Sequence, residues 1–152
     1  MKARSAPPRE VRIIGGQWKR TKLPVPDKPG LRPTPDRVRE TLFNWLGQDL
    51  SGWHCIDVFA GTGALGFEAA SRGAAPVLLV EQDPHLAELL RATQHKLQAA
   101  DVRVQRGDGL AVLASVAPGS FDLVFLDPPF DADAWDRALA GAVHAHLLRH
   151  AA

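Results

Sequence analysis

Residues 55–66 are Cys-Ile-Asp-Val-Phe-Ala-Gly-Thr-Gly-Ala-Leu-Gly, and this stretch decides the fold. An apolar run of strand length breaks into glycines spaced Gly-x-Gly-x-x-Gly, and an apolar helical pattern follows. This order predicts a strand, a tight turn and a helix whose N-terminal amides face a ligand.

Asp57 helps to decide which class of ligand this glycine turn binds. The glycine spacing suits dinucleotides and S-adenosylmethionine (SAM) equally. A carboxylate four residues before Gly61 would repel a pyrophosphate, whereas it suits the ammonium and sulfonium groups of SAM. We therefore favour SAM over a dinucleotide, and a glycine turn without a ligand remains an alternative.

The length and composition indicate one globular domain. The chain has 152 residues, of which 45% are hydrophobic and 23% charged, as is usual for a folded soluble protein. No stretch approaches the about 18 apolar residues of a membrane span, and the N-terminus has no signal-peptide core. The single cysteine, Cys55, lies on the first predicted core strand, so we expect a reduced thiol in a cytoplasmic protein.

Charge is distributed unevenly along the chain. Residues 1–40 carry eleven Lys and Arg against four acids, and the rest of the chain carries seven against thirteen. A basic segment on an acidic body indicates a polyanionic partner. We expect residues 1–10 to be a disordered basic tail.

Residues 11–32 have the content of a β-hairpin, with apolar residues on both sides of Gly15-Gly16. Basic side chains beside an indole can bind phosphates and stack on a base. The predicted RNA contacts are Arg12, Trp18, Lys19, Arg20 and Lys22, together with Arg39 from the next segment. The alternative is that these charges are only solvated.

The next segment predicts a helix that starts near Thr34 and ends at Gly47. Thr34 is the expected N-cap, Pro35 suits the first turn, and Asp36 complements the helix dipole. Its predicted apolar stripe consists of Val38, Leu42, Trp45 and Leu46.

From residue 55 onward strands and helices alternate. Strand patterns at 76–81, 101–108 and 121–126 are followed by helical patterns at 83–97, 110–116 and 132–149. Such alternation predicts an α/β fold, a Rossmann-like, mainly parallel sheet with helices on both faces.

An acid falls at the carboxyl end of each predicted core strand, where ligands of such sheets bind. These acids are Asp57, Glu81, Asp108 and Asp127. Glu81 is placed to accept from ribose hydroxyls, and Asp108 from the exocyclic amine of an adenine. Each acid taken singly also suits a turn or a helix cap.

Asp127-Pro128-Pro129-Phe130 carries the predicted chemistry. The prolines fix the backbone, so that one carboxylate and one ring are held at the rim of the pocket. A base can stack on Phe130 while its exocyclic amine donates to Asp127 and to the Pro128 carbonyl. Methyl transfer to that amine then depends mainly on positioning and electrostatics.

These motifs, with Arg12–Trp18, Lys22–Pro26 and Gly30–Trp45, resemble the bacterial 16S rRNA (guanine-N2)-methyltransferases (RsmD-type) of the class I SAM-dependent methyltransferase superfamily. The resemblance covers about residues 11–148. It implies SAM as cofactor and methylation of one guanine of 16S rRNA, within the small ribosomal subunit or a late assembly particle. We expect a monomer without a membrane segment.

The resemblance also implies the organisation and the cofactor residues. The domains would be a tail (1–10), a hairpin that binds RNA (11–32) and a methyltransferase domain (33–152) whose C-terminal strands are missing, because the family continues beyond this point. Arg32 is expected to reach the methionine carboxylate. The predicted cofactor residues are Arg32, Thr34, Asp57, Phe59, Ala60, Gly61, Thr62, Gly63, Glu81, Gln82, Asp108, Gly109 and Asp127.

Three functions compete at this point. They are methylation of an rRNA base or of another nucleic-acid base, a nicotinamide dehydrogenase, and an RNA-binding or SAM-binding domain without catalysis. The dehydrogenase would leave Asp57 and the Asp-Pro-Pro-Phe tetrad without a role. His144, His146 and His150 lack a further ligand at metal spacing, so we expect no metal site.

Overall fold

The computed structural model describes residues 10–29, 31 and 33–128. Strands β1 (Glu10–Arg12) and β2 (Lys22–Pro24) form an antiparallel pair. A second sheet is parallel, with the order β5-β4-β3-β6. Its strands are β3 (Cys55–Asp57), β4 (Val77–Glu81), β5 (Val102–Arg106) and β6 (Leu123–Phe125). The predicted parallel sheet is confirmed. Residues 1–9 of the predicted tail and the predicted helix at 132–149 lie outside the described residues, whereas Glu10, assigned to the tail, begins β1.

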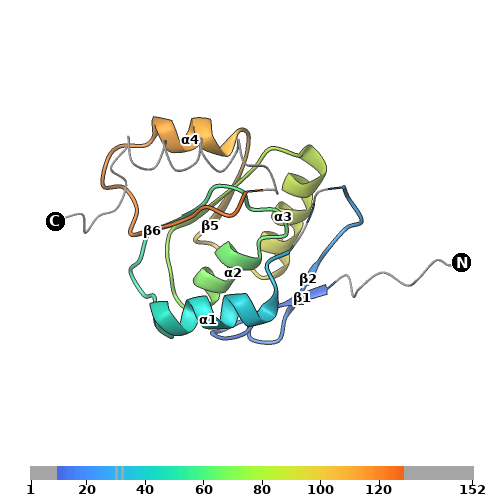
Figure 1. Ribbon diagram of the computed structural model, residues 1–152, viewed down its shortest axis with the longest axis vertical. Helices are drawn as coiled ribbons and strands as arrows, with labels where there is room; N and C mark the ends of the chain where they lie inside the picture. The colour runs from blue at the N-terminus through green and yellow to red at the C-terminus, as the bar shows by residue number, and fades with distance from the viewer. Residues whose placement is uncertain (1–9, 30, 32, 129–152) are drawn as a thin grey trace, which may run out of the picture.

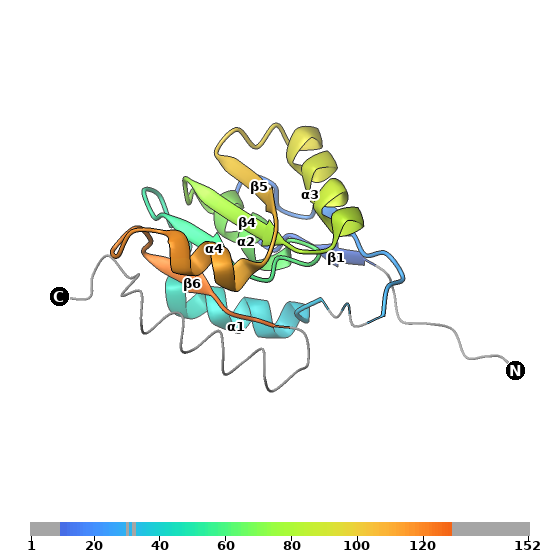
Figure 2. The same cartoon turned by 90° about the horizontal axis from the view of Figure 1, so that it is seen from above.

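Helices cover both faces of the larger sheet, as Figures 1 and 2 show. One face packs against α1 (Asp36–Leu46), α2 (Ala64–Ser71) and α3 (Pro84–Lys96), and the other against α4 (Gly109–Ser115). The described helices are all too short or too polar to cross a membrane.

Strand β3 is buried on both faces. Cys55 belongs to the core on the α2 face, whereas Ile56 belongs to the smaller core beneath α4, because successive side chains of a strand point to opposite faces. The expected buried thiol is confirmed. Burial raises the pKa of Cys55 to about 12, with a further contribution from Asp122, so the thiol stays protonated and unreactive.

The predicted hairpin is present, and it is docked onto helix α2. Val11 pairs with Leu23 across its two strands, and both side chains are buried in the main core. In the connecting loop, Trp18 N donates to Ser71 Oγ at 2.9 Å. Gly16 has φ +79°, and a Cβ there would lie 1.9 Å from Ser71 O, so only glycine permits this close approach.

Arg39 was predicted to contact RNA, and this prediction is wrong. Its side chain is fully buried. The guanidinium donates to Glu68 Oε1 at 3.2 Å, to the Arg12 carbonyl at 2.9 Å and to the Thr34 carbonyl at 3.1 Å, and it pairs with Asp36. Glu68 is buried as well, so the two charges need each other as partners.

Helix α1 therefore presents a different face to the core from the one predicted. Arg39 and Phe43 are buried, whereas Val38 is 52% and Trp45 81% exposed. Leu42 and Leu46 pack partly against the core, as expected. Gly47 ends the helix as predicted, with its amide donating to the Phe43 carbonyl.

The predicted N-cap of α1 is also wrong. The N-cap is Pro35, and no side chain caps the helix. The Thr34 hydroxyl bonds instead to Asp127, a residue far away in the sequence.

Replacing Arg39 by Met tests the buried ion pair, with Arg37→Met as the matched control, because Arg37 is exposed on the same helix. Arg39→Met keeps the aliphatic stem but removes every donor, so we expect a loss of about 3 kcal/mol in the free energy of unfolding. Arg37→Met should stay within about 0.5 kcal/mol of the wild type. Urea unfolding followed by circular dichroism measures both, and equal midpoints for the two variants would contradict this role of Arg39.

Candidate functional site

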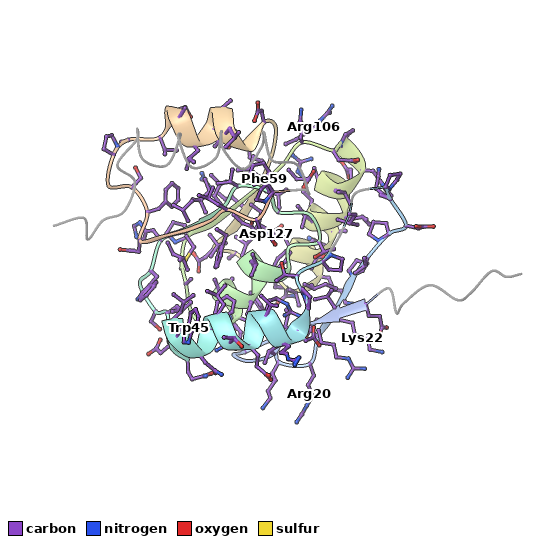
Figure 3. All side chains as sticks on the ribbon, viewed as in Figure 1. Arg20, Lys22, Trp45, Phe59, Arg106 and Asp127 are labelled. Carbon is purple, nitrogen blue, oxygen red and sulfur yellow. The ribbon has the colours of Figure 1, made fainter. Side chains whose placement is uncertain are left out.

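The carboxyl ends of the four parallel strands meet beside the glycine turn, and a small cavity of about 40 Å³ lies there. That volume compares with about 30 Å³ for one water molecule. Of the predicted cofactor residues, Thr34, Asp57, Phe59, Ala60, Gly61, Thr62 and Asp127 line it. Figure 3 places Phe59 and Asp127 near each other at the centre of the molecule. The predicted site is thus assembled from the linker before α1 and the ends of β3 and β6.

The glycine turn leads directly into α2, as predicted. Gly63 is the N-cap of this helix and has φ +84°. A Cβ at Gly63 would lie 2.5 Å from the ring of Phe67, so glycine is required both for the conformation and for the packing. The turn is also tied to the next strand, because Gly61 N donates to Glu81 Oε1 at 2.8 Å.

Asp57 is the most unusual acid of the site. Its side chain is only 1% exposed, and in the part of the chain that the structure describes no donor reaches Oδ1. Burial raises the pKa of Asp57 to about 7. The backbone amides of Gly66 and Phe59 act in the opposite direction, and the charges of Asp127 and Glu81 raise the pKa further. Among the described residues, the cavity therefore has a buried acceptor without a partner, which suits a cationic ligand.

Glu81 joins the glycine turn to the start of α3. Its Oε1 accepts from Gly61 N, and its Oε2 accepts from Asp83 N at 2.9 Å. Each carboxylate oxygen has a second lone pair, so ribose hydroxyls can still donate to Glu81. The role of Glu81 toward a ribose stays a prediction.

Asp83 caps α3, accepting from the amides of His85 and Leu86. Asp83 also pairs with Lys28, whose Nζ lies 2.9 Å from Asp83 Oδ2. The Lys28 hydrogen bond, followed by the Leu86 amide, lowers the pKa of Asp83. The ion pair holds the segment after β2 against the start of α3. No sequence pattern predicted this contact between residues 55 positions apart.

Asp108 and Gly109 follow the end of β5. Asp108 accepts from Leu110 N at 3.0 Å and so caps α4. Gly109 packs closely against Val58, the residue after β3, since a Cβ at Gly109 would lie 1.9 Å from Val58 O. Gln82 is exposed after β4. Contacts of these three residues with an adenosine remain predictions.

Asp127 lies at the rim of the cavity with its carboxylate exposed. Thr34 Oγ1 donates to Asp127 Oδ2 at 2.7 Å. Pro128 follows directly, whereas Pro129, Phe130 and Arg32 lie outside the described residues. Of the predicted catalytic tetrad, the structure therefore describes the carboxylate and the first proline.

The predicted RNA contacts Arg12, Lys19, Arg20 and Lys22 are exposed on the hairpin. Figure 3 shows Arg20 and Lys22 at the outer edge of the molecule, away from Phe59. Lys22 Nζ lies 3.3 Å from Glu10 Oε2. Trp18 packs partly against the main core, so only part of its ring is open to a base. These RNA contacts stay predictions, except for Arg39, which is buried.

A family model described as "Conserved hypothetical protein 95" matches residues 11–152. The chain belongs to this family. It is 50% identical over 121 residues to the ribosomal RNA small subunit methyltransferase D of Escherichia coli K12, an alignment that covers 80% of this chain and 61% of the relative. It is 42% identical to the protein of the same name from Haemophilus influenzae, over 86% of this chain and 69% of the relative. The chain thus spans about 61% of the length of the Escherichia coli relative.

Solved structures agree with this assignment. The Escherichia coli protein yhhF superposes with a TM-score of 0.81 at 41% identity, covering 91% of this chain and 75% of that one. The C-terminal domain of a precorrin-6Y C5,15-methyltransferase from Rhodobacter capsulatus has a TM-score of 0.58 at 18% identity, over 72% of this chain and 58% of that one. The latter likeness concerns the fold only. The fold is that of the class I methyltransferases, as the sequence predicted.

The raised pKa of Asp57 predicts a pH-dependent stability. An unfolded Asp titrates near 3.8, whereas folded Asp57 titrates near 7. The folded protein therefore binds this proton more tightly, and stability falls as pH rises between these two values. Asp57→Asn removes the titrating group, so its melting temperature should rise relative to the wild type at pH 8 more than at pH 5.

Differential scanning fluorimetry at both pH values measures this difference. Asp49→Asn is the control that should show no such difference, because hydrogen bonds from the Ser51 hydroxyl and amide lower the pKa of the exposed Asp49 carboxyl, which is therefore ionised at both pH 5 and pH 8. An identical difference between Asp57→Asn and wild type at pH 5 and pH 8 would contradict the assignment.

Proposed function

We propose that this chain forms the cofactor-binding and catalytic part of an enzyme that transfers a methyl group from SAM to the exocyclic N2 amine of a guanine in 16S rRNA. The observation that carries the proposal is Asp57, whose buried Oδ1 lacks a partner among the described residues and lines the cavity beside the glycine turn. The curated relatives named small subunit methyltransferases support the choice of rRNA.

The residues of the cavity fit SAM better than a dinucleotide. Asp57 Oδ1 is a buried acceptor for the cofactor ammonium, whose positive charge would favour the ionised form of this carboxyl, and Asp127 adds a second acid at the rim. A pyrophosphate would be repelled by both. Glu81 ends β4, and we propose that its carboxylate accepts from the ribose hydroxyls. When bound, SAM supplies an electrophilic methyl group on a positively charged sulfur.

Asp127 is the residue proposed to hold the target amine. Its exposed carboxylate accepts a hydrogen bond from the exocyclic amine at the rim of the cavity, with the Pro128 carbonyl as the second acceptor. Two acceptors on the amine hydrogens favour a nitrogen whose lone pair points toward the methyl donor. The contribution of the protein is then mainly alignment and electrostatic stabilisation, and Phe130 is proposed to stack on the guanine.

The hairpin is proposed to bind the RNA around the target base. Lys19 and Arg20 are exposed in its loop, which is anchored on α2 by the Trp18 and Ser71 contact. In this proposal the substrate is 16S rRNA within the small subunit or a late assembly particle. The enzyme acts as a monomer in the cytoplasm.

The proposed reaction predicts methyl transfer from labelled SAM to small ribosomal subunits that lack the modification. Asp127→Ala should lower the rate by at least about 100-fold, because the amine loses the acceptor that aligns it. Asp101→Ala is the control, since Asp101 is an exposed acid in the turn before β5. Mass spectrometry of the product nucleosides identifies N2-methylguanosine.

Calorimetric titration of the same variants separates binding from chemistry. SAM should bind to Asp101→Ala with the affinity of the wild type and to Asp127→Ala with a modestly lower affinity, because Asp127 mainly positions the target amine, and NAD should not bind. If the wild type binds NAD instead of SAM, or if Asp127→Ala transfers methyl at the normal rate, the proposed function is wrong.

The hairpin predicts a salt-dependent affinity for RNA. Each phosphate contact releases counterions and adds to the slope of log affinity against log salt. Exchanging both Lys19 and Arg20 for Glu should weaken binding of a 16S rRNA fragment and reduce this slope by about 1.5. Fluorescence anisotropy at several salt concentrations gives the slopes.

A double variant with the same change in net charge is the matched control. Arg91 and Arg103 are exposed on α3 and β5, and their exchange for Glu should leave the slope nearly unchanged. Equal reductions in both double variants would mean that RNA responds to net charge, and that the hairpin is not the binding surface.

A further inference from the structure

Thr34 and Asp127 are in contact although 93 residues separate them in the sequence. Thr34 belongs to the linker before α1, and Asp127 follows β6. The Thr34 hydroxyl donates to Asp127 Oδ2 at 2.7 Å, the length expected of an O–H···O bond to a carboxylate. One oxygen of the carboxylate at the proposed active site is therefore held by a side chain from another part of the chain.

Capping of α1 does not explain the Thr34 hydroxyl. A helix cap would accept from the amides of the first turn of α1, yet no side chain caps this helix. The hydroxyl instead acts as a donor to Asp127. Thr34 lines the small cavity together with Asp57 and Asp127.

The backbone of Thr34 is fixed from behind. Its carbonyl accepts from Arg39 Nε at 3.1 Å, and Arg39 is fully buried on its ion pair with Glu68. The neighbours Pro33 and Pro35 restrict the backbone on both sides. The backbone that positions the Thr34 hydroxyl is therefore rigid, as it must be if this hydroxyl is to orient another group.

We propose that Thr34 is a positioning residue for Asp127, which holds Oδ2 so that Oδ1 faces the amine of the target guanine. This proposal rests on the proposed function, in which Asp127 accepts from that amine. Asp127 is exposed, and an exposed carboxylate turns about its side-chain bonds unless a donor fixes it. A fixed carboxylate keeps the acceptor in line with the amine, so the alignment is prepared before the RNA binds.

Thr34→Val tests the hydroxyl, because valine has nearly the shape of threonine but no donor. Thr34→Ser restores the donor, and Thr41→Val is the matched control on the exposed side of α1. The measurements are the single-turnover rate of methyl transfer at saturating SAM and small subunits, the SAM affinity by calorimetry and the melting temperature. Asp127→Ala is measured in parallel.

We expect Thr34→Val to lower the single-turnover rate by about 10-fold to 100-fold, with SAM affinity and melting temperature close to the wild type. Thr34→Ser should recover most of the rate, and Thr41→Val should have no effect. A merely structural role would change the melting temperature, and a role in cofactor binding would change the SAM affinity.

Each other result overturns the proposal in a recognisable way. If Thr34→Val is as fast as the wild type while Asp127→Ala is inactive, Thr34 does not position Asp127 but the proposed function stands. If the rate of Thr34→Val falls in step with its SAM affinity, Thr34 binds the cofactor instead. If Thr34→Ser is as slow as Thr34→Val, the hydroxyl is not what matters. If Asp127→Ala keeps the wild-type rate, the proposed function itself fails.

Discussion

The buried ion pair between Arg39 and Glu68 is the constraint on which the rest of the structure depends. Neither side chain reaches solvent, so each charge must be satisfied inside the protein. Glu68 also accepts from the amides of Ile14 and Gly15 and from Arg72 Nε. Only an arrangement that keeps all these partners together avoids leaving a charge buried without compensation, and this fixes the hairpin, the linker, α1 and α2 relative to one another.

The position of Glu68 along α2 connects the two proposed binding surfaces. The helix begins at Ala64, directly after the glycine turn, and Glu68 lies one turn further on. The same short helix therefore contacts the cavity at its N-terminus and the hairpin along its side. An RNA held by the hairpin would be presented at a fixed distance from the methyl donor, without a flexible joint between the two.

Sequence periodicity predicted the elements between residues 55 and 126, because their hydrophobic patterns repeat regularly and an acid or glycine marks each end. It failed for α1, where Arg39 takes a core position and Trp45 does not. A pattern of apolar residues cannot indicate that a long cation will point inward. One signal was available in Glu68, a single acid within an otherwise apolar helix that is buried on all sides, since such an acid requires a cationic partner from elsewhere. The contacts of Lys28 with Asp83 and of Thr34 with Asp127 left no comparable trace, because each joins a single polar residue of the linker to a distant one.

Asp57 and Glu68 are both buried, on the strand and the helix that the glycine turn connects, but they differ in their hydrogen-bond partners. Glu68 is surrounded by donors, whereas Asp57 Oδ1 has none among the described residues. A buried acid with a structural role stabilises the folded protein through each hydrogen bond that it accepts, so all its oxygens are expected to have donors. An acid that awaits a cationic ligand must keep a lone pair available, and it destabilises the ligand-free protein at neutral pH as a result. Asp57 precedes the glycine turn and Glu68 follows it, so the contrast between these two carboxylates separates an acid that stabilises the fold from the acid that we propose for cofactor binding.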